Sequence, residues 1–327
     1  MAKPAPWEGR IGRRVRLRDL HVLFAVVQHG SMAKAGAYLG TSQSAISQAI
    51  AALEDAVQVP LLDRTPRGVE PTIYGAALIR RGQSAFDELR SGVQDIEFLA
   101  DPGTGEVRIA CTETVAAGLL PAVIDRFASR YPRVKLHVSQ TTTHLMGFAA
   151  LNDRNVDAVI TLLPKPFERD LTQHLQGEFL FNDRIGLAAA KDGPWGRRRK
   201  IAAADLINAN FISPPPDTDG GSALVQAFCA AGLSAPSVTV TSFSVHLRNL
   251  LSLRRRFVAV IPVSILKFNP DVYRLKELAI DLSAPPIPVL IVTLKNRTLS
   301  PSVRHFLACI RDVAKTMQSR IGPSTGK

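Results

Sequence analysis

The fold of this 327-residue chain is decided at residues 31–54, which read SMAKAGAYLGTSQSAISQAIAALE. The stretch predicts two short helices separated at Gly40, since glycine readily takes the positive φ with which many helices end. Ser31 and Ser42 stand where a hydroxyl can accept a hydrogen bond from the first turn of each helix. A preceding helix is predicted over residues 19–28 from apolar residues at helical spacing. Three helices in this order are typical of a helix-turn-helix, whose last helix lies in the major groove of DNA.

The last of these helices has two different faces. Its apolar residues recur at i, i+3, i+4 and i+7, namely Ile46, Ala49, Ile50 and Leu53. The other face carries short, uncharged hydrogen-bonding side chains, which suit the donors and acceptors on base edges. The residues predicted to contact DNA here are Ser31, Ser42, Gln43, Ser44, Ser47 and Gln48. The alternative is an ordinary helical bundle with a solvated polar face.

A hairpin or wing is predicted over residues 60–72, PLLDRTPRGVEPT. Pro66 and Gly68 mark its turn. We expect Arg64 and Arg67, beside that turn, to hold the phosphate backbone or enter the minor groove. The alternative is a solvated loop in which Arg64 pairs with a neighbouring carboxylate.

A long helix follows over residues 73–100, with Thr72 as its cap. Apolar and small residues alternate in steps of four and three, which is a heptad pattern: Leu78, Gly82, Ala85, Leu89, Gly92, Ile96 and Leu99. We expect two chains to pair through Leu78, Ala85, Leu89 and Ile96, with the glycines allowing a close approach. The alternative is a helix packed on its own domain. The run at residues 101–105, DPGTG, ends the helix and marks a domain boundary.

Five motifs in order over residues 17–75 resemble the LysR-type transcriptional regulators. They are Leu20-x-x-Leu23-Phe24-x-x-Val27, Gly30-Ser31-Met32-x-x-Ala35, Ser42-Gln43-x-Ala45-Ile46-Ser47-Gln48-x-Ile50-x-x-Leu53-Glu54, Leu61-Leu62-x-Arg64 and Thr72-x-x-Gly75. The chain departs from the family at Gly36, usually Ala, at Ser44, often Pro, and at Leu62, usually Phe. The region of Arg64–Arg81 looks most like the subgroup that regulates sugar uptake or aromatic-acid catabolism.

The resemblance implies a cytoplasmic, sequence-specific transcriptional regulator without enzymatic activity. Its implied partners are double-stranded promoter DNA, a small-molecule effector, RNA polymerase and further copies of itself in a homodimer or homotetramer. No cofactor is expected.

Strands alternating with helices are predicted from Gly105 onward, which favours α/β lobes with largely parallel sheets. The fold class is therefore α plus α/β, with a winged helix-turn-helix, a linker helix and a two-lobed effector domain that resembles type 2 periplasmic-binding proteins. The expected boundaries are a basic N-terminal arm at 1–16, the DNA-binding domain at 17–72, the linker helix at 73–100, the effector-binding domain at 101–320 and a tail at 321–327. Within the effector domain we expect lobe I at about 105–178 and 275–319, and lobe II at about 179–274.

Small hydroxyl residues follow several predicted strands, where helices begin and a cleft is expected. The predicted effector-binding residues are Thr112, Thr114, Thr141, Thr143, Thr161, Ser213 and Ser242. Hydroxyls and free N–H groups at such positions suit a carboxylate or a sugar. Each of them can equally be a helix cap or a turn residue without a ligand. His246 and Arg248 are expected at the surface or in a dimer contact.

Composition adds little to the functional prediction. The net charge is +12, but residues 1–80 contribute only +4, so the bulk charge does not identify a DNA-binding region. The three cysteines, Cys111, Cys229 and Cys309, predict no disulfide framework and fit a reducing compartment. No signal peptide, membrane span, catalytic signature or metal-ligand spacing is evident. Two alternatives stay open: a thiol-redox-sensing regulator of the same fold, acting through Cys111, and a two-lobed solute-binding protein or enzyme.

Overall fold

The computed structural model describes residues 14–65, 68–101, 103–163, 171, 173–254, 256–269, 272–280, 282 and 284–318, without the side chains of residues 64, 65 and 219. The chain divides between Arg90 and Ser91 into two compact units, which are described separately. Most of the predicted basic arm and all of the predicted tail lie outside the described residues. Among the residues described, no helix has the length and hydropathy needed to span a membrane.

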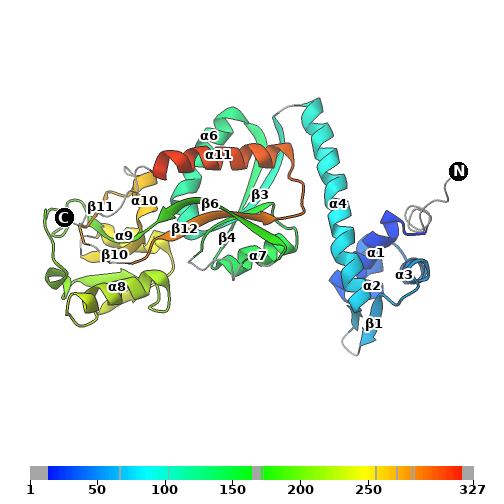
Figure 1. Ribbon diagram of the computed structural model, residues 1–327, viewed down its shortest axis with the longest axis horizontal. Coiled ribbons are helices and arrows are strands. Elements are labelled where there is room, and N and C mark those ends of the chain that lie inside the picture. Colours follow the sequence, from blue (N-terminus) through cyan, green and yellow to red (C-terminus); the bar gives the residue numbers. More distant parts are fainter. Residues whose placement is uncertain are drawn as a thin grey trace. The chain divides into compact units, whose positions relative to one another are not determined.

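The described residues of the first unit form three short helices, a hairpin and the first part of a long helix, in the order that the sequence predicts (Figure 1). The helices are α1 (Leu17–His29), α2 (Met32–Leu39) and α3 (Gln43–Val57), and the hairpin strands are β1 (Leu62–Thr65) and β2 (Gly68–Pro71). Leu23, Ile46 and Leu53 lie fully buried at the centre of the core that the three helices share.

The predicted helix caps are present. The Ser31 hydroxyl accepts from the Lys34 N–H at 3.2 Å, and the Ser42 hydroxyl accepts from the Ala45 N–H, also at 3.2 Å. Gly40 ends α2 with a φ of 64°, a conformation that most side chains avoid. The turn between α2 and α3 is therefore fixed by local chemistry, as in a helix-turn-helix.

The hairpin is tied to α3 by a carboxylate. Glu54 near the end of α3 accepts from the Leu61 N–H at 2.7 Å and from the Leu62 N–H at 3.3 Å. The Val69 N–H of β2 donates to the Gly30 carbonyl at 2.9 Å. The hairpin is thus held to the body of the helix-turn-helix at two points.

The long helix α4 (Ile73–Ala100) begins as predicted, with the Thr72 hydroxyl accepting from the Gly75 N–H at 3.0 Å. Its first half packs on its own unit. Leu78 is half-buried against the helical core, and a side chain at Gly82 would meet the ring of Phe24. The prediction that Gly82 admits a partner helix is wrong, because Phe24 already fills that space.

The part of the second unit that the structure describes is built on two five-stranded sheets. The first sheet has the order β4-β3-β5-β12-β6 and the second has the order β11-β7-β10-β8-β9. The strands of the first are β3 (Thr104–Thr112), β4 (Arg133–Thr141), β5 (Ala158–Leu162), β6 (Leu175–Asp183) and β12 (Ile287–Leu294). Those of the second are β7 (Ile185–Ala190), β8 (Asn210–Ser213), β9 (Val238–Thr241), β10 (Phe257–Pro262) and β11 (Leu275–Glu277).

Helices follow most strands of both sheets. They are α5 (Glu113–Ala117), α6 (Leu119–Arg130), α7 (His144–Asn152), the 3₁₀ helix η2 (Ala203–Leu206), α8 (Asp219–Ala230), α9 (Val245–Leu253), α10 (Val263–Phe268) and α11 (Pro301–Gln318). Each sheet has its own apolar core: Phe127 and Phe306 lie in that of the first, and Phe211 and Phe228 in that of the second. Each sheet with its helices therefore forms one lobe, lobe I and lobe II.

The sheets are mixed, which corrects the expectation that they are largely parallel. In the first sheet β3 pairs in parallel with β4 and β5, but β12 runs antiparallel to β5 and β6. In the second, β10 is parallel to β8 and antiparallel to β7. The chain therefore closes each lobe with returning strands rather than with crossovers alone.

The lobe boundaries also differ from those predicted, because β6 and β11 were not predicted as strands. β6 extends the first sheet to Asp183, five residues beyond the expected end of that lobe segment at 178, and β11 at 275–277 belongs to the second sheet rather than the first. Among the described strands β6 pairs only with β12, and an edge strand of this kind tolerates polar residues that hide its pattern. β11 has only three residues, which is too short for a periodicity.

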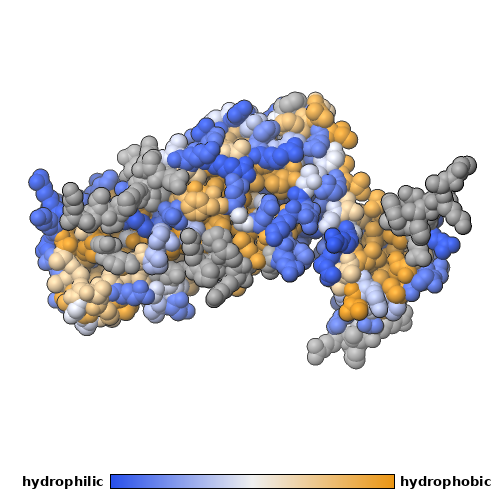
Figure 2. All heavy atoms as spheres, viewed as in Figure 1, coloured by the Kyte–Doolittle hydropathy of each residue, from blue (hydrophilic) through white to orange (hydrophobic). Residues whose placement is uncertain are grey.

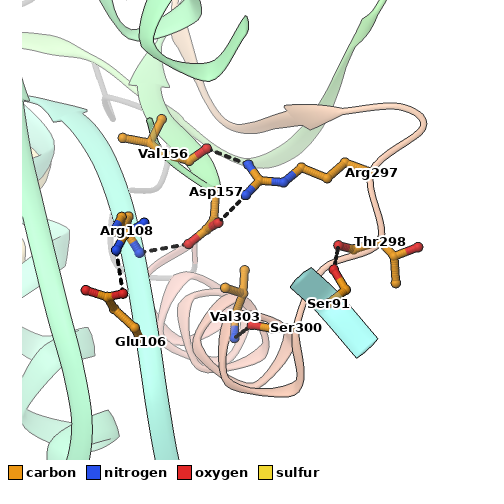
Figure 3. Close-up of polar contacts among 9 residues, drawn as sticks. All are labelled: Ser91, Glu106, Arg108, Val156, Asp157, Arg297, Thr298, Ser300 and Val303. Carbon is orange, nitrogen blue, oxygen red and sulfur yellow. Dashed lines mark hydrogen bonds and ion pairs between the residues drawn. The ribbon is translucent and has the colours of Figure 1, made fainter. Parts of the chain in front are cut away.

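Polar contacts join the second half of α4 to lobe I (Figure 3). The Ser91 hydroxyl donates to the Thr298 carbonyl at 2.9 Å. The neighbouring Arg297 donates to the Val156 carbonyl at 2.7 Å and to the Asp157 carboxylate at 2.8 Å. The loop after β12 is thereby anchored both to α4 and to the start of β5.

Candidate functional site

The outer face of α3 presents the side chains that the sequence predicts for base contact. Gln43, Ser44 and Gln48 are exposed on it. Ser47 is half-buried, and its hydroxyl donates to the Met32 sulfur at 3.1 Å, so it is turned partly toward α2. The structure therefore brings three of the predicted residues together on one exposed helix face.

The two capping serines lie beside this face but are already engaged. The hydroxyls of Ser31 and Ser42 accept from backbone N–H groups, and Ser42 and Ser44 also share a hydrogen bond of 2.9 Å between their hydroxyls. Arg64 lies in β1 with an undescribed side chain, and Arg67 lies outside the described residues. The roles of both arginines therefore stay predictions.

A groove lined by three arginines, two of them from the predicted basic arm, borders α3. It has a volume of about 540 Å³ and lies between α3 and the segment that leads into α1. Arg14, Arg16 and Arg18 are exposed along one wall, and Gln48 and Asp55 of α3 line the other. The proximity of Arg18 to the reading helix depends on how α1 packs on α3, which residue spacing alone does not give.

The second half of α4 exposes apolar side chains. Among the predicted pairing residues, Ala85, Leu89 and Ile96 are exposed, with 67% of the Ile96 surface accessible. Val93, which was not predicted, is exposed as well. Figure 2 shows apolar surface over the end of α4 that leads into the second unit. Exposed residues of this size at helical spacing are unusual on a helix without a partner.

A cleft of about 820 Å³ lies between the two lobes of the second unit. Lobe I lines it from the end of β3 and the start of α5 with Thr112, Glu113 and Thr114, and from the end of β4 with residues 140–145. Lobe II lines it chiefly from the starts of α8 and α9. The predicted residues Thr112, Thr114, Thr141 and Thr143 all lie in this lining.

The other three predicted effector residues do not line the cleft. Thr161 is fully buried in β5 and its hydroxyl donates to the Leu162 carbonyl at 3.2 Å. Ser213 is buried at the end of β8. Ser242 accepts from the Ser244 N–H at 3.1 Å and so holds the turn before α9. Thr161 and Ser213 are both buried within their lobes and are absent from the cleft lining.

Arg248 is the main cleft residue that the sequence interpretation placed wrongly. It is only 4% exposed, lines the cleft, and donates from Nη1 to the Val260 carbonyl at 2.9 Å. Burial lowers its pKa to about 10, while the negative charge of Glu113 acts in the opposite direction, so the guanidinium stays charged at neutral pH. The prediction of a surface position is wrong because α9 buries Arg248, Asn249 and Ser252 and exposes leucines instead.

Glu113 at the start of α5 makes hydrogen bonds across the cleft. Its carboxylate accepts from the Val245 N–H at 2.8 Å, from the His246 N–H at 3.2 Å and from the Ser244 hydroxyl at 3.3 Å. His246 thus takes part through its backbone. Glu113 was not predicted as a cleft residue. The available sequence signal is an acidic residue directly after a strand that ends at the cleft.

Cys111 is a buried residue of β3 next to this cleft. It is fully buried, and burial raises its pKa to about 11. The thiol is therefore protonated at neutral pH, whereas oxidant sensing requires a thiolate. This environment opposes the redox-sensing alternative. Among the described residues, no group of three or more His, Cys, Asp or Glu side chains is placed to hold a metal ion.

Comparison with protein families accounts for both units. The family model for the bacterial regulatory helix-turn-helix protein, lysR family, matches residues 17–76, and that for the LysR substrate binding domain matches residues 100–315. The chain belongs to the LysR family. It is accordingly a DNA-binding transcriptional regulator with an effector-binding domain, and not an enzyme.

Individual relatives of this LysR-family regulator resemble it along most of its length. It is 27% identical over 326 residues to the HTH-type transcriptional regulator GbpR of Azospirillum brasilense, covering 97% of this chain and 91% of that protein. It is 25% identical to the HTH-type transcriptional regulator GalR of Pseudomonas putida, covering 90% and 73%.

Solved structures share the fold of this LysR-family regulator. A variant of full-length OxyR from Pseudomonas aeruginosa matches with a TM-score of 0.60 at 18% identity, covering 92% of this chain and 95% of that one. CbnR, a LysR family transcriptional regulator, matches with a TM-score of 0.50 at 20% identity, covering 91% and 100%.

Proposed function

We propose that this LysR-family regulator binds promoter DNA sequence-specifically as a homodimer or homotetramer, and that a sugar or carboxylate bound between its lobes modulates the binding. The observation that carries the proposal is the presence in one chain of an exposed, uncharged hydrogen-bonding face on α3 and of a hydroxyl-lined cleft of about 820 Å³. Promoter binding of this kind brings the regulator within reach of RNA polymerase.

In the proposed DNA complex, Gln43, Ser44 and Gln48 of α3 contact base edges. The amide of a glutamine can hydrogen-bond adenine at two positions, and each such contact discriminates by about 1–3 kcal/mol. Ser31, Ser42 and Ser47 flank this face and support it through their caps and packing. The arginines of the groove, Arg14, Arg16 and Arg18, together with Arg64 and Arg67 of the wing, contact phosphates and fix the position of the helix.

We infer that α4 pairs two chains. Leu89, Val93 and Ile96 are exposed on it, and burial of such side chains against a second copy stabilises a dimer by about 25 cal/mol per Å² of apolar surface. Ala85 lies beside them, and Leu78 contributes from its half-buried position. A symmetric dimer implies an operator with two related half-sites.

The proposed effector contacts hydroxyls from lobe I. Thr112, Thr114, Thr141 and Thr143 lie in the cleft lining at the ends of β3 and β4. A ligand held by both lobes favours one lobe arrangement over another, and its binding energy can then bias DNA affinity.

The test is a footprint of the full chain on the DNA upstream of its own gene, with and without sugars and aromatic acids. Gln43→Ala combined with Gln48→Ala should lower specific affinity at least roughly 30-fold while leaving nonspecific binding nearly unchanged. Gln28→Ala on α1 is the matched control, since Gln28 is exposed but lies on another helix. A footprint that is independent of sequence, or that survives the double substitution, would contradict the proposal.

A further inference from the structure

The N-terminus of α9 is already occupied by a carboxylate of this chain. The first N–H groups of a helix lack partners within the helix and attract negative charge. Here the N–H groups of Val245 and His246 donate to Glu113, and the Ser244 hydroxyl donates to it as well. The same Ser244 oxygen accepts from the Leu247 N–H at 3.2 Å, so the helix start is satisfied from two directions.

The donor and the acceptor of this contact belong to different lobes. Glu113 begins α5, directly after β3 of lobe I, whereas α9 lies in lobe II between β9 and β10. The contact therefore crosses the cleft. It bridges the two lobes at one of the helix N-termini that line the cleft, beside those of α7 and α8.

The remaining charges of the cleft do not compensate for a second carboxylate. Among the described lining residues the charged side chains are Glu113, Asp217 and Arg248, which leaves one net negative charge. Arg248 already donates from Nη1 to the Val260 carbonyl, and its guanidinium interacts electrostatically with the Glu113 carboxylate. A ligand carboxylate placed here would face two fixed carboxylates with one guanidinium to offset all three, which is unfavourable.

The uncharged groups of the cleft favour another kind of ligand. The Thr112 hydroxyl oxygen is buried and has no hydrogen-bond partner among the described residues, and Thr114, Gln140 and Thr142 add further polar groups. The ring of Phe243, about half exposed, also lines the cleft and offers an apolar face. Hydroxyl groups of a ligand can form hydrogen bonds with these threonine and glutamine side chains, while the carbon skeleton of the ligand packs on the Phe243 ring.

We propose that Glu113 is a resident ligand of the α9 N-terminus. Its carboxylate fills that acid-binding position and, together with the net negative charge of the lining, selects an uncharged, hydroxyl-rich effector such as a sugar. This rests on the proposed function in one respect, that the effector binds in the cleft. It restricts the proposed effector to uncharged ligands and excludes carboxylates.

The first test asks whether the position that Glu113 fills is a carboxylate site, and it needs no effector. Glu113→Ala in the full chain should lower the Tm of the effector domain by roughly 2–6 °C, the size expected for loss of a helix cap. Sodium acetate should restore at least half of this loss relative to sodium chloride at equal ionic strength. It should leave the wild type and Asp125→Ala unchanged, because Asp125 is an exposed carboxylate of lobe I that caps no helix.

The second test compares a neutral sugar with the acid of the same skeleton by calorimetry, using D-galactose with D-galacturonate and D-glucose with D-glucuronate. The wild type should bind the neutral member of a pair at least roughly 10-fold more tightly, and Glu113→Gln should narrow that difference. Glu113→Gln keeps the size of the side chain, so it serves if Glu113→Ala does not fold. If no sugar of the panel binds, acetate rescue alone decides whether the acid-binding position exists.

Absence of acetate rescue would overturn the inference, as would a wild type that binds the acids as tightly as the sugars. Neither result would remove the operator footprint, which tests the proposed function separately. Loss of the footprint with acetate rescue intact would instead contradict the proposed function and leave the resident carboxylate standing.

Discussion

Arg297 and Asp157 form an ion pair of 2.8 Å whose side chains are only 8% and 17% exposed. The pair joins the loop after β12 to the start of β5, and the same carboxylate accepts from the Arg108 N–H at 2.9 Å (Figure 3). Removing one partner of such a largely buried ion pair destabilises the fold, because water cannot replace the lost partner of the remaining charge.

Arg297→Ala should therefore lower the free energy of unfolding of the effector domain by about 3 kcal/mol, which is the range for a broken buried pair. Chemical denaturation of the full chain measures this. The matched control is Arg311→Ala, whose pair with Glu178 has side chains 39% and 46% exposed, and whose loss should cost at most about 1 kcal/mol. Equal costs for the two variants would contradict the argument.

Asp183 makes the stability of the effector domain depend on pH. It is fully buried at the end of β6, and burial raises its pKa from 3.8 to about 6, although hydrogen bonds from Ser264 and Arg184 act the other way. Between these values the folded state binds the proton more tightly than the unfolded state. The stabilising contribution of Asp183 to the free energy of unfolding is thus present below about pH 4 and is lost as the pH rises through 6.

Asp183→Asn should remove this dependence. Relative to the variant, the wild type should lose up to about 3 kcal/mol in unfolding free energy between pH 4 and pH 7. Denaturation curves at several pH values measure the difference. Parallel curves for the two proteins would show that the carboxyl titrates normally.

Two glycines of α4 should respond in opposite directions to alanine. A Cβ at Gly82 would lie 2.9 Å from a ring carbon of Phe24, so Gly82→Ala should destabilise the DNA-binding domain by about 1–3 kcal/mol. A Cβ at Gly92 meets nothing within 4 Å, so Gly92→Ala should stabilise the helix by up to about 1 kcal/mol. Thermal unfolding of both variants provides the measurement, and a stabilised Gly82→Ala would refute the packing described for Phe24.

The exposed apolar residues of α4 should determine the oligomeric state. Leu89→Asp combined with Ile96→Asp places charges where a partner helix is proposed and should shift the chain to monomer in sedimentation analysis, with operator affinity falling at least roughly 10-fold. Glu97→Ala, on the same exposed helix, is the control and should keep the wild-type state. A double variant that stays oligomeric would place the subunit contact elsewhere.

Ser42 allows capping to be separated from base contact. Ser42→Ala should destabilise the DNA-binding domain by about 1 kcal/mol, whereas Ser42→Gly should cost only a few tenths. If the hydroxyl acts through the cap alone, operator affinity follows stability across the two variants. A Ser42→Gly protein that is stable yet binds poorly would indicate direct contact with DNA.

The elements that the sequence predicted well are those set by local signals. Ser31, Gly40 and Ser42 fix the helix-turn-helix because caps and a positive φ act within a few residues. The same holds for α4, whose start and end follow Thr72 and the break at residues 101–105. β6, β11 and the mixed order of the sheets depend on pairing between distant segments, which no local pattern reports.

The effector cleft was predicted only in part, because local sequence signals place some of its residues and distant packing places the others. Thr112 and Thr141 could be placed because they stand at the carboxyl ends of strands. Arg248 could not, since its burial requires the partners that Glu113 and β10 supply from elsewhere in the chain. Arg248 was expected at the surface or in a dimer contact because charged residues of an amphipathic helix usually face solvent, whereas α9 buries it together with Asn249 and Ser252.

The tie between Glu54 and the backbone of Leu61 and Leu62 has a consequence for the operator. Because these hydrogen bonds hold the hairpin to α3, the angle between the hairpin and α3 is fixed within each DNA-binding domain. In the proposed dimer we therefore expect an effector to change the distance between the two half-sites that the dimer binds, but not the base sequence that each half-site must have. Operators that respond to the effector should accordingly differ in spacing and agree in their half-site sequence.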